Sequence, residues 1–369
     1  MIRARHLSIG PLLVLAGCST IFGFDGDYAE TGSTANSDPT SPTTEGSSPP
    51  LGGGAPDAAP PSAELPADAS STLDAALHPD GEAGVTAPPP PSCGVGRATC
   101  GPLATDDCCR VAAVPGGTFD RLNRPSSPAT VSAFALDVYE VTVARFRTFV
   151  QSGRGTKAIP PAAGAGASPS IPASGWKSSY DDQLPVNTAA LVAELGCPKG
   201  TYTDQAGTNE SRPVGCVSWY VAFAFCAWDG GRLPSEAEKS FAATGGSEQR
   251  VYPWSSPPAS ATIDSTYATY DTSAPRNVGA VSPKGDGRWG HADLAGNISE
   301  WSLDAYADAL PTPCTDCVAL STPTLRVRNG GGFDENASLA KNDYRYGGTP
   351  GVVLGRTGLR CARPSKPPH

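Results

Sequence analysis

The chain has 369 residues, enough for one large domain or two small ones, and a formal net charge of −9 at pH 7. The acidic excess lies between Asp25 and Ser92, which hold 11 acidic residues and no basic one. From Cys93 onward acidic and basic residues balance at 25 each, without a basic stripe, which argues against a nucleic-acid partner. The scarcity of histidine also disfavours a histidine-based hydrolase, because only His291 and the C-terminal His369 follow the acidic segment.

The first 18 residues have the features of a lipoprotein signal. Arg3 and Arg5 precede an apolar run that is too short to span a bilayer as a mature helix. "LAGC" at 15–18 resembles the bacterial lipobox, which predicts removal of the signal peptide 1–17 and acylation of Cys18. Ser19 in the next position favours an outer-membrane lipoprotein, facing the periplasm or the cell surface and held by its lipid anchor. The alternative is an ordinary signal peptide with an unrelated cysteine.

Residues 18–92 are built mainly from Pro, Ala, Ser, Thr, Gly and Asp. Such a segment cannot bury enough apolar surface to offset its ordering entropy, so we expect a disordered tether after the acylated cysteine. It ends in the polyproline run 88–91. A Cys-rich segment, 93–113, follows, then a folded domain over 114–363 and a short tail, 364–369.

Ten cysteines follow the tether, and an even number in an exported protein predicts disulfides. We expect the adjacent Cys108 and Cys109 to pair outward with Cys93 and Cys100, in an order that the sequence leaves open. Cys314 and Cys317, with two residues between them, predict a tight structural disulfide. A redox pair or half of a metal site are the alternatives, although zinc would lack a second pair of ligands.

The folded part begins with strand signals at 114–119 and 131–142. Thr142 predicts the N-cap of a helix that continues to about Val150. Residues 158–179 are rich in Gly, Pro, Ala and Ser and predict a long loop, as do residues 304–323.

Two more helices have clear boundary signals. Ser218 predicts the N-cap of a helix over 219–228, which is apolar on nearly all sides and therefore buried. "SEAE" at 235–238 is a capping box, and it opens a helix to about Thr244 that Gly245 ends. Beyond Val251 only short strand signals remain. These elements predict a loop-rich α+β fold stapled by disulfides.

Seven motifs in order carry a resemblance to a known family. They are "PGGTF" (115–119), "LDVYEVTVARFRTFV" (136–150), "RPVGCVSWYVAFAFCAW" (212–228), "RLPSEAE" (232–238), "YPW" (252–254), "DLAGNISEW" (293–301) and "GLRCAR" (358–363). Together they resemble the formylglycine-generating enzymes, also called sulfatase-modifying factor domains. The resemblance implies a C-type-lectin-like α+β fold over roughly 114–363.

The family's enzymes oxidise a cysteine of a sulfatase to formylglycine with two cysteines, copper and oxygen. In "RVRNGGGFDENASLAKNDYR" (326–345), three positions match the family's pattern, namely Gly330, Gly331 and Phe333. Gly332 stands at the family's serine, Glu335 at the first cysteine and Ala340 at the second. Copper(I) prefers thiolates, so we expect no copper, no catalytic residue and no formylglycine formation.

The resemblance also implies a disulfide between Cys226 and Cys361, and Cys197 and Cys216 flank a polar loop and form a further candidate pair. It implies a structural calcium site in the motif 293–301, with carboxylates and backbone carbonyls as ligands. Its four residues are Asp293, Gly296, Ile298 and Glu300. The alternative is a polar turn without an ion.

Without its cysteines, the family's cleft is a candidate binding groove. Its candidate residues are Gly332, Phe333, Asp334, Glu335, Asn336 and Arg345. We expect an outer-membrane-tethered, non-catalytic binding or scaffold module with an unknown protein, peptide or glycan partner. The alternatives are a solvated loop, an oxidoreductase of the formylglycine-generating type, or another enzyme that reuses the cleft with Asp334 and Glu335 as an acid–base pair.

Overall fold

The computed structural model describes residues 89–94, 98–321 and 324–365. The predicted signal peptide, Cys18 and nearly all of the predicted tether lie outside the described residues. Within the described ranges, no helix is long and apolar enough to cross a bilayer.

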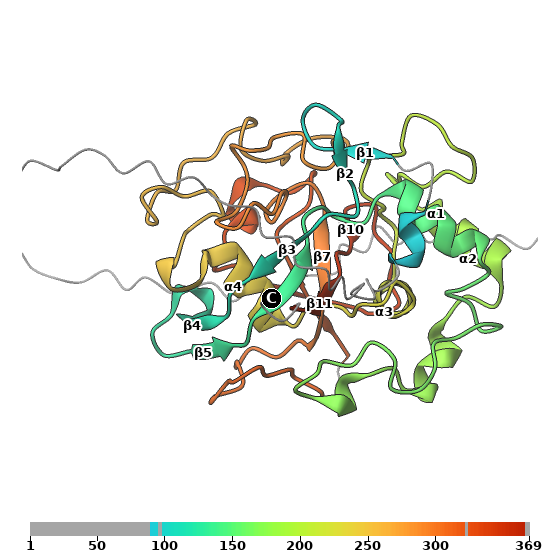
Figure 1. Cartoon of the computed structure of the whole chain (residues 1–369), viewed down its shortest axis with the longest axis horizontal. Helices are drawn as coiled ribbons and strands as arrows, with labels where there is room; N and C mark the ends of the chain where they lie inside the picture. Colours follow the sequence, from blue (N-terminus) through green and yellow to red (C-terminus); the bar gives the residue numbers. More distant parts are fainter. Residues whose placement is uncertain (1–88, 95–97, 322–323, 366–369) are drawn as a thin grey trace, which may run out of the picture.

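Two small sheets form the middle of the fold (Figure 1). Helix α4 (Glu236–Thr244) and the hairpin of β4 (Gly117–Asp120) and β5 (Pro128–Val131) lie on one side, and α1 (Val143–Gln151) and α2 (Thr188–Leu195) lie on the other. In the four-stranded sheet the order is β10-β7-β8-β9, and only the β10–β7 pair is parallel. The antiparallel three-stranded sheet has the order β11-β6-β3, and β1–β2 and β4–β5 form separate pairs. The strands are β1 (Thr99–Cys100), β2 (Asp106–Asp107), β3 (Val111–Val114), β4 (Gly117–Asp120), β5 (Pro128–Val131), β6 (Phe134–Asp137), β7 (Ser299–Ala305), β8 (Arg326–Asn329), β9 (Tyr346–Gly348), β10 (Thr357–Gly358) and β11 (Ala362–Pro364).

In the described part of the chain the α-helices are α1 (Val143–Gln151), α2 (Thr188–Leu195), α3 (Trp219–Trp228) and α4 (Glu236–Thr244). Three predicted boundaries are confirmed, because the side chains of Thr142, Ser218 and Ser235 cap α1, α3 and α4. Glu238 completes the capping box of α4, and the left-handed Gly245 ends that helix. Short 3-10 helices occur at Pro91–Cys93, Arg121–Asn123, Pro172–Ser174, Ser178–Gln183, Gly246–Glu248 and Ala337–Ala340.

Two stretches differ from the sequence-based expectation. Residues 131–142 form no continuous strand: β5 ends at Val131 and β6 ends at Asp137. Between them, Ser132 turns to bind the Asp316 carboxylate through its backbone N–H at 2.6 Å. Helix α2 was not predicted, although Asn187 caps it and the Leu191–Leu195 pair buries its inner face. The first strand of the three-stranded sheet, β3, begins at Val111, inside the Cys-rich segment.

Helix α3 lies in the largest apolar cluster, as its all-round apolar sequence predicts. Phe225 stacks on Phe146 of α1, with ring centroids 5.3 Å apart. Trp219 and Phe223 contact each other edge to face at 5.2 Å, and Phe223 also contacts Trp176. These aromatic contacts hold α1, α3 and the loop 158–179 together.

Five disulfides link all ten cysteines of the described domain. Cys108 and Cys109 pair outward as predicted, Cys109 with Cys93 and Cys108 with Cys100. The other bridges join Cys197 to Cys216, Cys226 to Cys361 and Cys314 to Cys317. No free thiol therefore remains among the described residues.

Candidate functional site

The glycine-rich turn after β8 has the backbone that the motif requires. Gly330 and Gly331 have φ values of 98° and 73°, in the region that favours glycine. A Cβ at Gly331 would lie 3.0 Å from the Leu339 carbonyl oxygen. Phe333 is fully buried, and its N–H donates to the Asn297 carbonyl at 2.8 Å. Residues 330–333 therefore keep the turn and the buried aromatic side chain that the family's fold requires.

Gly332 shows why the family's serine is not accommodated here. A Cβ added at Gly332 would lie 2.7 Å from Cβ of Arg356. That distance is shorter than real contacts allow, so the Arg356 side chain fills the space that a serine would need.

Glu335, at the first cysteine position, is buried and fully engaged. Its Oε2 accepts hydrogen bonds from the Gly332 N–H at 2.6 Å and from the Tyr346 hydroxyl at 3.0 Å. Its Oε1 forms an ion pair with Nε of Arg356 at 2.9 Å. Ala340, at the second position, is buried beside Tyr252 and Ala295. Glu335 thus binds neighbouring polar groups, and Ala340 packs in an apolar cluster. Neither side chain offers a soft metal ligand.

The other predicted cleft residues do not converge on one hollow. Asp334 forms a 2.7 Å ion pair with the half-exposed Lys199, which is not among the partners of Glu335. Asn336 is exposed and caps the 3-10 helix Ala337–Ala340. Arg345 turns into the protein, where it pairs with both oxygens of Glu236. Asp334 and Glu335 have different partners and form no acid–base pair, although they lie in a turn and not on the extended strand that the sequence suggested.

Of the predicted calcium ligands, Glu300 is already neutralised by two buried cations. Its carboxylate accepts a 2.5 Å hydrogen bond from Nζ of Lys239 and 2.9 Å hydrogen bonds from Nε of Arg360. Burial opposes ionisation of Glu300, but Arg360 and Lys239 outweigh it and hold its pKa below the usual range. Burial likewise lowers the pKa of Lys239, to about 8.

Asp293, the second predicted carboxylate ligand, accepts the Gly279 N–H at 2.6 Å. Burial raises its pKa to about 6. The N–H of Ile298 donates to Glu140 rather than to solvent, at 3.0 Å. The described residues contain no group of three or more His, Cys, Asp or Glu side chains placed to hold a metal ion. Because Lys239 and Arg360 hold Glu300, one of the two predicted carboxylate ligands, the described contacts disfavour calcium at this carboxylate, and the calcium site stays a prediction.

Sequence reasoning missed the rest of this buried charge cluster. Arg360 is fully buried, and its guanidinium also donates to the carbonyls of Asp137, Val138, Ala292 and Asp293. Glu140 is equally buried, and burial, followed by the charges of Asp293 and Glu300, raises its pKa well above the usual value. The sequence feature that could have indicated this cluster is Lys239, a charged residue within a helix that is otherwise buried.

His291 offers no catalytic base. It is fully buried, and burial together with the charge of Arg360 lowers its pKa to about 3. The imidazole is therefore neutral at physiological pH, away from solvent. Neither a histidine-based hydrolase nor a thiol pair can be assembled from the described residues.

Comparison with known proteins gives the same family as the motifs. Residues 97–365 match the sulfatase-modifying factor enzyme 1-like domain family. The formylglycine-generating enzyme of Thermomonospora curvata is 30% identical over 296 residues, covering 68% of this chain and 92% of that protein. The inactive C-alpha-formylglycine-generating enzyme 2 of Mus musculus is 28% identical, covering 64% and 77%. Among solved structures, PvdO from Pseudomonas aeruginosa aligns with a TM-score of 0.49 at 18% identity, covering 69% of this chain and 94% of PvdO. The chain belongs to the sulfatase-modifying factor enzyme 1-like domain family.

Proposed function

We propose that this chain is a non-catalytic member of its family that acts as a binding or scaffold module. The observation that carries the proposal is the replacement of the two cysteine positions by a locked Glu335 and a buried Ala340. The commitment of all ten described-domain cysteines to disulfides supports it, since no other thiol pair is in place. Relatives that are named inactive formylglycine-generating enzymes show that the family includes such forms.

The proposal places the module at the outer membrane through an acylated Cys18, facing the periplasm or the surface. The sequence "LAGC" and the acidic, proline-rich residues that follow support this location. Metabolic labelling with a palmitate analogue tests it, with Cys18→Ala as the control. Label on the parent and not on the variant supports the anchor, and an unlabelled, soluble parent refutes it.

The partner class is tested by capture from detergent-solubilised membranes alongside a glycan array. A reproducible protein partner supports a scaffold, and saturable glycan binding supports a binder.

The competing oxidase function is tested by incubating the protein with copper, oxygen and a peptide that carries the sulfatase motif. Conversion of the peptide cysteine would remove the non-catalytic proposal.

A further inference from the structure

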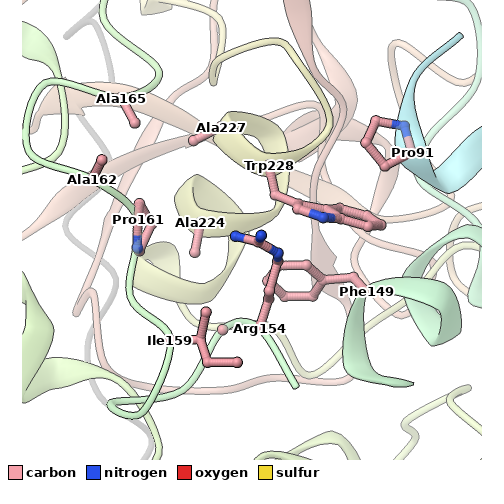
Figure 2. A pocket seen from close by; sticks show the side chains of 11 residues that line it. Pro91, Phe149, Arg154, Ile159, Pro161, Ala162, Ala165, Ala224, Ala227 and Trp228 are labelled. Atoms are coloured by element: carbon pink, nitrogen blue, oxygen red, sulfur yellow. The ribbon is translucent and has the colours of Figure 1, made fainter. Parts of the chain in front are cut away.

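A pocket of about 380 Å³ lies between α1, α3 and the loop after α1, outside the glycine-rich turn. We call it the α1–α3 pocket. Apart from Arg154, every described residue that lines it has an apolar side chain or is glycine (Figure 2). The lining residues are Pro91, Phe149, Arg154, Gly155, Ile159, Pro161, Ala162, Ala165, Ala224, Ala227 and Trp228.

Small side chains on one face of α3 create this space. Ala224 and Ala227 line the pocket, and Trp228 closes one end. The Trp228 ring packs against Phe149 of α1, with centroids 5.3 Å apart, so this wall is fixed by the core. Ile159 also lines the pocket, and its side chain is 42% exposed.

The opposite wall is held in place by backbone contacts. Gly155 has a φ of +73°, and a Cβ there would lie 2.6 Å from the Phe149 ring, so the loop approaches α1 as closely as glycine permits. The loop is also pinned by hydrogen bonds from the N–H of Gly164 to Trp176 and from the N–H of Trp176 to Ala165, both at 2.9 Å. The pocket is therefore formed before any ligand arrives.

Two donors at this pocket have no partner within the described part of the chain. Arg154 is exposed and makes no hydrogen bond or ion pair there, and the indole N–H of Trp228 makes no hydrogen bond. Figure 2 shows the Arg154 guanidinium on the same side of the pocket as the Trp228 indole. Among the described residues no acidic side chain lines the pocket, so an anion would meet a cation and no opposing charge from them.

We propose that the α1–α3 pocket binds a small organic carboxylate with an apolar or aromatic body. Arg154 pairs with the carboxylate, and the body lies against Trp228 and the alanine face of α3. This inference deepens the proposed binding function by giving it a site and a ligand class. It uses none of the residues 330–345, so it stands or falls independently of the formylglycine assay.

The test is isothermal titration of the full chain with 4-phenylbutyrate, its neutral amide 4-phenylbutyramide and its cationic analogue 4-phenylbutylamine. We expect the carboxylate to bind about tenfold more tightly than the amide, and the amine more weakly than both, because a charge-assisted hydrogen bond separates them. Arg154→Gln should weaken the carboxylate to the level of the amide and leave the amide unchanged.

Two variants complete the design. Arg124→Gln is the matched control, because this arginine lies outside the pocket and its guanidinium has no hydrogen bond within the described residues. Ala227→Leu should fill the pocket and weaken carboxylate and amide alike, with folding checked by thermal unfolding. Equal affinity for carboxylate and amide, no saturable carboxylate binding at millimolar concentration, or an Arg154→Gln variant that binds like the parent would each overturn the proposal.

Discussion

Nζ of Lys239 lies 2.5 Å from Oε2 of Glu300, and both side chains are almost completely buried. Arg360 pairs with the same carboxylate at 2.8 Å. The buried Glu300 carboxylate thus joins α4, β7 and the link between β10 and β11 through two cations. Because Arg360 still pairs with Glu300 when Lys239 is removed, the loss of Lys239 takes a charge-assisted hydrogen bond from the buried carboxylate rather than its last countercharge.

Lys239→Met should therefore destabilise the domain by about 2 kcal/mol, the cost of removing a hydrogen bond between charged groups from a buried carboxylate. The measurement is the free energy of unfolding in urea. Lys157→Met is the matched control, because Lys157 pairs at 3.9 Å with the exposed Asp182 and should change stability by less than about 0.5 kcal/mol. Similar effects of the two variants would contradict a structural role for the buried pair.

Calcium should leave the Tm of the parent protein unchanged, because Lys239 and Arg360 already occupy the Glu300 carboxylate. The measurement is thermal unfolding with millimolar calcium and with a chelator. A ligand that binds only the folded state raises Tm, so a clear rise with calcium would show a site. If that rise disappeared in Asp293→Ala, the calcium set implied by the family resemblance would be the correct one.

Asp304 predicts a pH dependence of stability. Its carboxylate is buried and accepts the N–H groups of Glu236 and Ala319, both at 2.8 Å. Burial, followed by the charge of Glu236, raises its pKa to about 7. The unfolded value is about 3.9, so the folded state binds this proton more tightly and the associated stability falls as pH rises from about 4 to 7.

Asp304→Asn should remove this dependence. Between pH 5 and pH 7.5 the variant should lose about 2 kcal/mol less stability than the parent, measured by urea unfolding at each pH. Asp182→Asn, at a carboxylate that is 91% exposed, should follow the parent curve. Parallel curves for parent and Asp304→Asn would show that Asp304 does not titrate in this range.

The disulfide between Cys226 and Cys361 should matter more than the one between Cys314 and Cys317. Their sequence separations are 135 and 3 residues. In the chain-entropy account, replacing the first pair with alanines costs up to about 4–5 kcal/mol and the second about 2 kcal/mol. Urea unfolding of the two double variants measures the difference, and a larger loss for the short bridge would contradict this ranking.

The sequence predicted those features that depend on residues close together in the chain. The caps of α1, α3 and α4 follow from residues within one turn of each helix, so Thr142, Ser218 and Ser235 could be identified. The outward pairing of Cys108 and Cys109 also follows from adjacency. Helix α2 carried the same type of signal at Asn187, but the surrounding Gly- and Pro-rich loops hid it.

The candidate site was less predictable because its contacts span long sequence distances. Lys239 and Glu300 are 61 residues apart, and Arg360 lies 60 residues beyond Glu300. No local pattern reports that two cations converge on one carboxylate. The α1–α3 pocket likewise depends on small residues of α3 facing a loop some 60 residues earlier, which only the packed fold reveals.

The most direct test of the central claim is mass spectrometry of a sulfatase-motif peptide after incubation with the protein, copper and oxygen. The Thermomonospora curvata relative, named a formylglycine-generating enzyme, serves as the positive control. Because Glu335 and Ala340 replace the thiol pair, the account predicts no conversion above the protein-free reaction. Conversion at a rate comparable with the positive control would contradict the account.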